Sequence, residues 1–235
     1  LGLLLNQSKI LIGENEFYNC KKLEEIKITS KINFLGNKSF WGCVNLSQIN
    51  IPSSVKRIGE YTFCLCKSLK RIVIPSSIKT IGSGCFQDCL SLEEIILPNS
   101  ILNIDNFAFS NCISLKTIIL PDSLETLGDY VFKKCASLEQ ISIPSSVLSA
   151  GCGDFIGCTS LAKCEISSSM EFINGSFFKE CSSLEQITIP SSIKLIGNNA
   201  FTNCTSLKLI SIPNSLQIDF KTIGIEDPSI IKVIS

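Results

Sequence analysis

The chain has 235 residues, and its 21 Lys and Arg side chains balance 21 Asp and Glu side chains, so the formal net charge is zero. Because no excess of positive charge is available to neutralise phosphates, nucleic acid is not an expected partner. The apolar opening 1–5 is too short to span a bilayer and no run of 18 apolar residues follows, so we expect no membrane insertion by this segment.

One residue spacing organises nearly the whole chain. Nine cysteines, here called the ladder cysteines, follow one another at intervals of 23 residues: Cys20, Cys43, Cys66, Cys89, Cys112, Cys135, Cys158, Cys181 and Cys204. With each ladder cysteine at position 0, Phe occupies position −3 and Leu position +3 in all nine copies. So strict a period indicates one small unit copied along an axis. We therefore expect a single solenoid over 1–235, with regular repeats at about 12–216 and an irregular tail or C-terminal cap at 217–235.

The first predicted element of each unit is a short strand. Apolar residues alternate at positions +6 and +8, as Ile95 and Leu97 do in the fourth copy, which predicts a strand with these side chains on its inner face. Pro98 at position +9 lacks an N–H and ends the strand. Too few residues separate the copies for any other pairing, so each strand should pair with its equivalent in the next copy. A parallel sheet along the solenoid is expected.

The rest of each unit is predicted as a corner and a return arm. Small polar residues such as Ser53 and Ser54 should turn the corner by bonding nearby backbone groups, and apolar residues such as Ile78 and Ile81 should point inward. A tight turn with positive φ is expected at the glycines that commonly follow: Gly36, Gly59, Gly82, Gly128, Gly151 and Gly197. The spacing of three from Phe to Cys to Leu predicts a turn of 3-10 helix.

The cysteines are expected to be free thiols. Stacked units place equivalent residues about 5 Å apart with parallel side chains, whereas a disulfide needs two facing Cβ atoms. The ladder thiols should therefore pack as small hydrophobic groups. Four cysteines lie off the ladder, at Cys64, Cys85, Cys152 and Cys164. Zinc binding by Cys64 with Cys66, or by Cys85 with Cys89, is the alternative, but a structural site needs four converging ligands and we expect no metal site.

The pattern Ile-Gly-x-x-x-Phe-x-x-Cys-x-Ser-Leu-x-x-Ile-x-Ile-Pro-x-Ser-Ile, written by residues 58–78, closely resembles the BspA-like class of leucine-rich repeats. The resemblance covers roughly Ile12 to Leu216. It implies a curved, right-handed leucine-rich-repeat solenoid with a parallel concave sheet, on a bacterial or protozoan cell surface, used for adhesion to host proteins or other cells. It brings no catalytic residues that could be transferred to this chain.

Two stretches depart from the pattern. Between residues 150 and 174, Ala150 replaces a bulky aliphatic residue, Cys164 the strand isoleucine, Ser167 the proline and Asn174 the glycine. We expect altered curvature or local softness there. After Leu216 the register is lost, which is the reason for treating 217–235 as a tail or cap.

Composition argues against an enzyme. The chain has no histidine, which removes Ser-His, Cys-His and His-metal chemistry. The recurring glutamates at position +4 are explained by a solvated position, so no acid pair is expected. No catalytic residue and no cofactor is therefore predicted. Carbohydrate binding would need an aromatic platform, whereas Trp41 and the three tyrosines lie outside the predicted strands.

The best candidate site is on the outer face of the predicted sheet, at positions +5 and +7. Three apolar residues fall in register there on adjacent strands, and we call them the stripe: Val73, Ile96 and Ile119, flanked by Arg71, Glu94 and Thr117. We interpret these six residues as a partner-binding patch, since repeat proteins commonly use this surface. The alternative is that β-branched residues simply favour strands.

The predicted function is a non-enzymatic protein-binding scaffold, secreted or at the cell surface, that uses the concave sheet for adhesion or host interaction. The alternative is a cytoplasmic interaction scaffold or signalling adaptor, because oxidising compartments select against many free cysteines. The chain begins at Leu1 and not at methionine, so we expect a processed or truncated protein. The oligomeric state is open.

Overall fold

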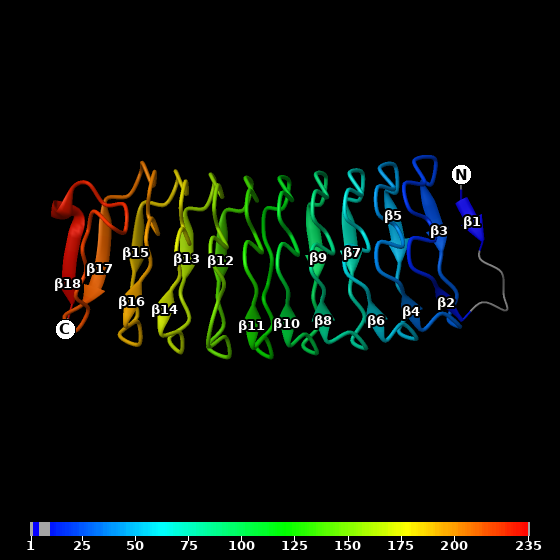
Figure 1. Ribbon diagram of the computed structural model, residues 1–235, viewed down its shortest axis with the longest axis horizontal. Helices are drawn as coiled ribbons and strands as arrows, with labels where there is room; N and C mark the ends of the chain where they lie inside the picture. The colour runs from blue at the N-terminus through cyan, green and yellow to red at the C-terminus, as the bar shows by residue number, and fades with distance from the viewer. Residues whose placement is uncertain (1, 5–9, 235) are drawn as a thin grey trace.

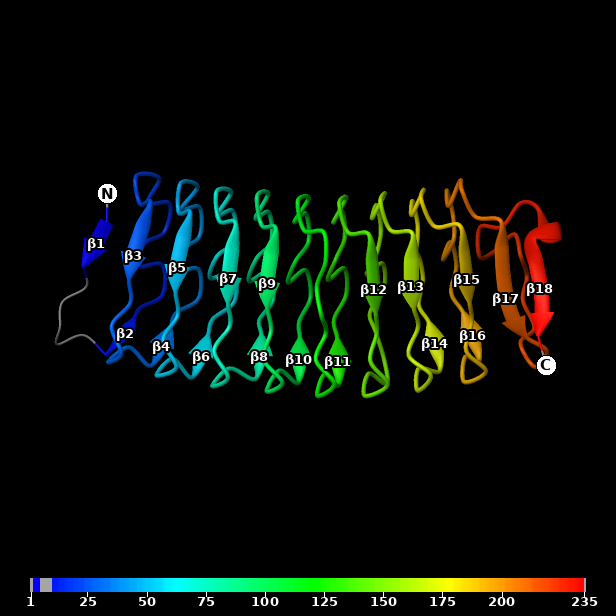
Figure 2. The same cartoon turned by 180° about the vertical axis from the view of Figure 1, so that it is seen from behind.

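The computed structural model describes residues 2–4 and 10–234. The chain winds into a long row of coils that lie side by side, with the two termini at opposite ends (Figure 1 and, from behind, Figure 2). Each ladder cysteine marks one coil, from coil 1 with Cys20 to coil 9 with Cys204. The expected leucine-rich-repeat solenoid of parallel strands is confirmed.

Three-residue strands at positions +5 to +7 form one face of the row, here called the long-strand face. Strands of neighbouring coils pair in parallel within four short sheets of the described chain, with Ile72 opposite Ile95 for example. The strands are β1 (Gly2–Leu4), β3 (Glu25–Lys27), β5 (Gln48–Asn50), β7 (Arg71–Val73), β9 (Glu94–Ile96), β12 (Gln140–Ser142), β13 (Lys163–Glu165) and β15 (Gln186–Thr188), followed by the longer β17 (Leu209–Pro213) and β18 (Ile231–Ile234). The central residue is buried between two exposed ones in β3, β5, β7, β9, β12 and β15.

A second set of strands, absent from the sequence prediction, forms the short-strand face. Each consists of two residues and pairs in parallel with its equivalent in a neighbouring coil, as Leu35 does with Ile58. They are β2 (Leu11–Ile12), β4 (Phe34–Leu35), β6 (Arg57–Ile58), β8 (Thr80–Ile81), β10 (Asn103–Ile104), β11 (Thr126–Leu127), β14 (Phe172–Ile173) and β16 (Leu195–Ile196). The return arm is therefore held by backbone pairing as well as by its buried side chains.

The expected turn of helix around Phe and Cys does not form. Cys43 N–H does donate to Phe40 O at 3.1 Å and Leu46 N–H to Cys43 O at 3.0 Å, as in successive tight turns. However, φ is positive at position −1 of all nine coils, from 57° at Asn19 to 71° at Gly42. A right-handed helix cannot continue through that conformation. In the described chain the single helix is the 3-10 turn η1 (Pro228–Ile230) in the tail.

The glycines at position −7 do not have the expected positive φ, and a different constraint explains them. A Cβ on Gly36 would lie 2.5 Å from the backbone nitrogen of Glu14, and a Cβ on Gly151 would lie 2.3 Å from the backbone oxygen of Gly128. At five of the six glycines the backbone of the neighbouring coil lies too close for any side chain, and Gly82, where a Cβ would meet nothing closer than 3.6 Å, is the exception. Positive φ belongs instead to positions −5 and −1, where residues such as Tyr61 and Leu65 carry full side chains.

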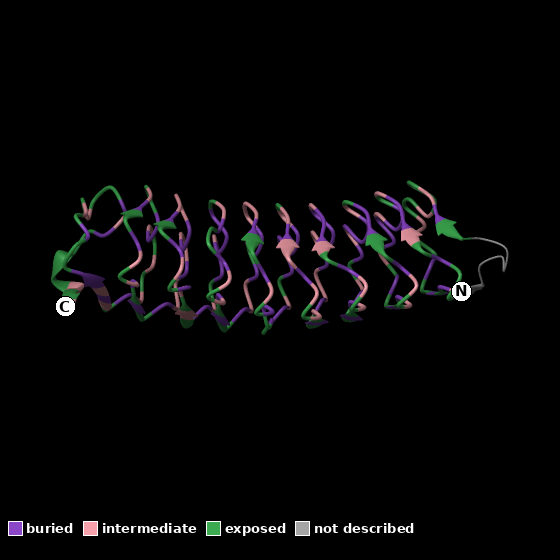
Figure 3. Cartoon of the chain, turned by 90° about the horizontal axis from the view of Figure 1, so that it is seen from below, coloured by how far each residue is buried: buried purple, intermediate pink, exposed green. Residues whose placement is uncertain are grey.

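The core is a row of identical contacts between coils. The nine phenylalanines at position −3 stack face to face with ring centroids 5.2 to 5.7 Å apart, from Phe17 to Phe201. Beside them lie the ladder cysteines, of which Cys43 to Cys181 are buried. Figure 3 shows buried residues in every coil along the length of the row. Because the inward side chains of each coil pack against those of the coils on both sides, the core is continuous along the solenoid.

The corner serines also tie one coil to the previous one. Ser54 Oγ donates to Ile32 O at 2.7 Å, and Ser123 Oγ donates to Ile101 O at 2.7 Å. We expected hydroxyl bonds within the corner itself. The bond to the preceding coil stabilises the stacking instead of the turn.

The tail continues the stack with a shortened coil. Ile223 and Ile225 are buried against coil 9, and β18 pairs in parallel with β17. Ile231 lies opposite Ile210, a spacing of 21 residues in place of 23 (231 − 210 = 21). The ladder pattern thus ends at coil 9, but the sheet extends one strand further.

Candidate protein-binding face

The stripe lies on the long-strand face, where the sequence placed it. Val73 of β7 is directly opposite Ile96 of β9, and both side chains are exposed, at 47% and 40%. Ile119 of the next coil is 85% exposed. Three apolar side chains in consecutive coils therefore face the solvent, while their neighbours Ile72, Ile95 and Ile118 are buried.

The two charged residues beside the stripe form an ion pair with each other. Arg71 Nε and Glu94 Oε2, which lie opposite each other on β7 and β9, form an ion pair at 2.7 Å with both side chains more than half exposed. An exposed pair of this kind contributes about 0.2 to 1 kcal/mol to stability. The flank of the stripe therefore offers polar groups with no net charge.

Strand propensity does not account for Ile119. The segment 117–119 is not a regular strand: Thr117 forms one isolated bridge to Gln140, and Ile119 belongs to no paired strand. A β-branched residue there gains little from pairing. The exposure of Ile119 is thus unexplained by the fold alone.

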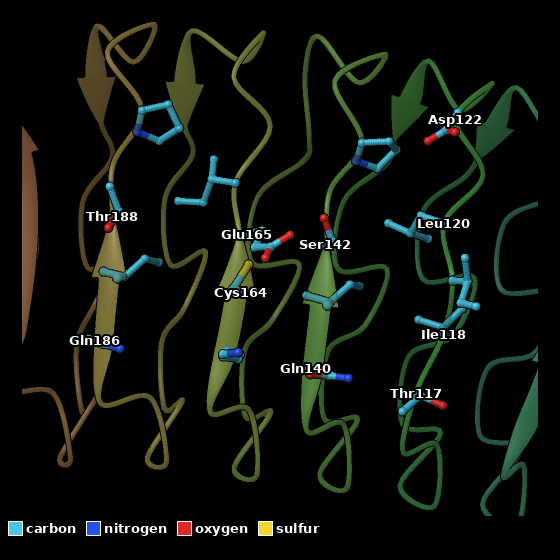
Figure 4. A pocket seen from close by; sticks show the side chains of 17 residues that line it. Thr117, Ile118, Leu120, Asp122, Gln140, Ser142, Cys164, Glu165, Gln186 and Thr188 are labelled. Atoms are coloured by element: carbon cyan, nitrogen blue, oxygen red, sulfur yellow. The ribbon is translucent and has the colours of Figure 1, made fainter.

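A shallow hollow begins at Thr117 and Ile119, the end of the stripe, and runs along the same face over coils 5 to 8. Its volume is about 870 Å³. In Figure 4, Thr117, Gln140 and Gln186 lie toward one end of the strands and Ser142, Glu165 and Thr188 toward the other, with Cys164 between them. This hollow was not predicted from the sequence. Its only signal was the departure at Cys164 and Ser167, where small residues replace the isoleucine and proline of other coils.

The cysteines supply neither a nucleophile nor a metal site on this face. All thirteen are free, and burial raises the pKa of the Cys135 thiol to about 12, so that this thiol is protonated at neutral pH. Cys64, Cys66, Cys85 and Cys89 are all buried. Over residues 2–4 and 10–234, no group of three or more His, Cys, Asp or Glu side chains is arranged to hold a metal ion.

Four aromatic side chains on the turn segments stack in pairs, while the exposed Phe172 lies on β14 of the short-strand face. Tyr18 and Trp41 stack on each other with centroids 4.5 Å apart, and Phe107 stacks on Tyr130 at 5.2 Å. These contacts join neighbouring coils. They give the aromatic residues a structural role in the stacking.

Within the part of the chain that the structure describes, no helix is long and apolar enough to cross a membrane.

The parallel strands, the stacked phenylalanines and the 23-residue period define a leucine-rich-repeat solenoid, a class whose members are typically non-enzymatic scaffolds that bind proteins. Residues 3–116 and 79–208 match the BspA type leucine rich repeat region, in six copies, and the chain belongs to this family. No curated protein matches the chain.

The chain is similar to several solved structures, and two of them, with TM-scores above 0.5, have the same fold. A leucine-rich repeat protein of T. pallidum is 26% identical with a TM-score of 0.65, covering 94% of this chain and 92% of its own. One from Eubacterium ventriosum is 20% identical with a TM-score of 0.53, covering 95% and 79%. A leucine rich cell surface protein from Faecalibacterium prausnitzii is 23% identical and covers 96% and 83%, with a TM-score of 0.46.

Proposed function

We propose that this protein is a non-enzymatic scaffold that binds a protein partner through the stripe Val73, Ile96 and Ile119, and that it works at the cell surface or after secretion. The observation that carries the proposal is the 85% exposure of Ile119 in line with two other exposed apolar side chains. Keeping a row of apolar side chains in water is unfavourable. Their presence on the surface therefore favours a role in contact with a partner.

The expected partner presents a neutral, apolar ridge. Covering the stripe would contribute on the order of 1 kcal/mol each for the half-buried Val73 and Ile96 and about 2 kcal/mol for the exposed Ile119. The Arg71–Glu94 pair at the edge would supply hydrogen bonds without selecting a charged surface. The family resemblance supports a surface location, and adhesion to another cell or to a host protein is the finer form of the proposal.

The test measures binding of the purified protein to a panel of purified cell-surface and extracellular-matrix proteins by surface plasmon resonance. Ile96→Asp and Ile119→Asp should each weaken binding at least about tenfold, because each buries a carboxylate in an apolar contact. Thr188→Asp is the matched control: Thr188 occupies the same position +7 on β15, three coils beyond Ile119. It should bind as the unaltered protein does.

Two results would count against the proposal. If both stripe variants bind normally while folded, the stripe is not the contact and strand propensity explains Val73 and Ile96. If no protein of the panel binds, the adhesion role loses its support and the cytoplasmic scaffold becomes the better interpretation.

A further inference from the structure

The backbone pairing between coils is interrupted at one place. At every other junction in the described chain, strands or an isolated bridge join the two coils on at least one face. Between coil 7 (Cys158) and coil 8 (Cys181) there is neither. On the long-strand face β13 pairs with β12 and β15 pairs with β17. On the short-strand face Ser149 bridges back to Thr126, and β14 pairs forward with β16.

One amide shows what is missing. Ile143 N–H donates to Glu165 O at 2.9 Å, which joins coil 6 to coil 7, and Ile189 N–H donates to Ser211 O at 2.8 Å, which joins coil 8 to coil 9. Ile166 occupies the same position +8 in coil 7. Within the described residues its N–H makes no corresponding bond to coil 8, as is also the case for Ile51 and Leu97, whose coils are instead joined to the next one by paired strands on the short-strand face.

The side chains at this junction explain the interruption. Cys164 stands where Ile141 and Ile187 are buried in the adjacent coils, and both Cys164 and Ile166 are only partly buried. Ala150 replaces the aliphatic residue of the short-strand face. On the long-strand face the side chain at position +6 is therefore smaller in coil 7 than in coils 6 and 8, whereas Phe177 on the turn side and Met170 on the return arm are fully buried. Cys164 also lines the hollow over coils 5 to 8 (Figure 4).

The turn side of the same junction is intact. Gly153, Phe155 and Gly157 donate backbone hydrogen bonds to Gly175, Phe177 and Lys179 at 2.9 to 3.0 Å. Cys181 Sγ donates to Phe155 O at 3.2 Å, and the rings of Phe155 and Phe178 stack at 5.7 Å. The two coils are therefore joined by several backbone bonds on the turn side, by one side-chain bond from Asn174 Nδ2 to Ala150 O at 2.6 Å on the short-strand face and, in the described chain, by no backbone pairing on either strand face.

We propose that the solenoid bends at the junction of coils 7 and 8, because the described residues have no backbone pairing there on either strand face and Cys164 fills less of the long-strand face than the isoleucine of the adjacent coils. The turn segment around Phe155 and Cys181 is the pivot, and both strand faces open about it. Coils 1 to 7 and coils 8 to 9 then move as two rigid parts. The bend changes the hollow, which spans the junction, and leaves the stripe of coils 3 to 5 unaltered.

The test is hydrogen exchange of the whole 235-residue protein followed by mass spectrometry. Peptides covering 163–167 and 186–189 should exchange about tenfold faster than peptides covering 140–144, because local opening exposes amides without global unfolding. The turn segment 153–158 should stay protected. Equal exchange at 163–167 and 140–144 would overturn the proposal, and this comparison needs no variant.

A variant tests the cause. Cys164→Ile restores the residue found at this position in the adjacent coils and should slow exchange severalfold at 163–167 and 186–189. Cys152→Ser, which alters an exposed cysteine of the same coil, is the matched control and should leave exchange unchanged. If Cys164→Ile folds and its exchange is unchanged, the missing side-chain volume is not the cause and the proposal is wrong.

Discussion

The thiol of Cys112 donates a hydrogen bond to the backbone oxygen of Phe86, 26 residues earlier in the chain, at 3.1 Å. The same bond recurs in eight ladder cysteines, each to the phenylalanine of the preceding coil. The phenylalanine oxygen also accepts the N–H of the ladder cysteine in its own coil, as Phe86 does from Cys89. Cysteine at position 0 thus fills a small apolar space and ties two coils together.

We predict that every thiol is reduced and that most react only after unfolding. Nine cysteines are buried, Cys20, Cys164 and Cys204 are partly buried, and Cys152 is exposed. A thiol reagent at pH 8 should label Cys152 quickly in the folded protein, because burial holds the pKa of the others well above that pH where a shift is resolved, as in Cys112. Thiol counting with mapping of the labelled peptides checks this.

Denatured protein provides the control for the thiol prediction. In guanidinium all thirteen cysteines should react. Fewer than thirteen reactive thiols would reveal disulfides. Applied to protein from its native compartment, the same count separates the surface interpretation from the cytoplasmic one, since a fully reduced set inside cells would argue against a surface role.

Truncating the phenylalanine stack should be costly. Phe109 is fully buried between Phe86 and Phe132, with centroid separations of 5.6 Å on both sides. Phe109→Ala should lower the free energy of unfolding by about 3 to 5 kcal/mol through lost burial and an unfilled cavity. Denaturant titration measures it. Phe172→Ala is the control, because Phe172 is 46% exposed, and a comparable loss there would contradict the assignment of the stack as the core.

Two glycines at the same position −7 should respond differently to alanine. A Cβ on Gly36 would lie 2.5 Å from backbone atoms of coil 1, whereas a Cβ on Gly82 would meet nothing closer than 3.6 Å. Gly36→Ala should therefore destabilise by about 1 to 3 kcal/mol through overpacking. Gly82→Ala should be neutral or stabilise by about 0.4 to 1 kcal/mol, because it restricts the unfolded chain. Similar thermal denaturation of the two variants would refute the close-approach explanation.

Asp154 should make stability depend on pH. Its carboxyl group is fully buried, Oδ1 accepts the Val131 N–H at 3.0 Å, and Oδ2 has no hydrogen-bond partner among the described residues. Loss of solvation raises the pKa of this carboxyl well above its usual value, and the nearby Asp129 adds to the effect. The folded state therefore favours the neutral form.

The sign of the effect follows from linkage. The favourable contribution of neutral Asp154 is complete below the unfolded pKa of about 3.9 and is lost as the pH rises through the raised folded pKa. Asp154→Asn cannot titrate, so the variant should gain stability relative to the unaltered protein between pH 4 and pH 7. Urea titrations at several pH values measure the difference. A difference independent of pH would show that Asp154 is not protonated in the fold.

Burial was predicted correctly from the sequence at repeat positions that have the same surroundings in every coil. Phe109 at position −3 and Ile95 at position +6 were correctly placed in the core, because every coil gives those positions the same buried neighbours. The stripe was predicted as exposed on the same grounds, and its side chains are exposed, although its role as a binding site stays a proposal. The hollow could not be predicted, because its shape depends on how Cys164 and Ile166 pack at the junction of coils 7 and 8.

The amino-acid sequence by itself determined the period, the inner face and the free thiols, because a 23-residue repeat forces equivalent residues into equivalent stacked positions. Only the tertiary structure decided why glycine is required at Gly36, where two backbones come too close for a Cβ. It also decided that the Cys112 thiol is bonded to Phe86 and that coils 7 and 8 are unpaired. Those features depend on distances between neighbouring coils, which are set by the packing of both coils together and by neither repeat alone.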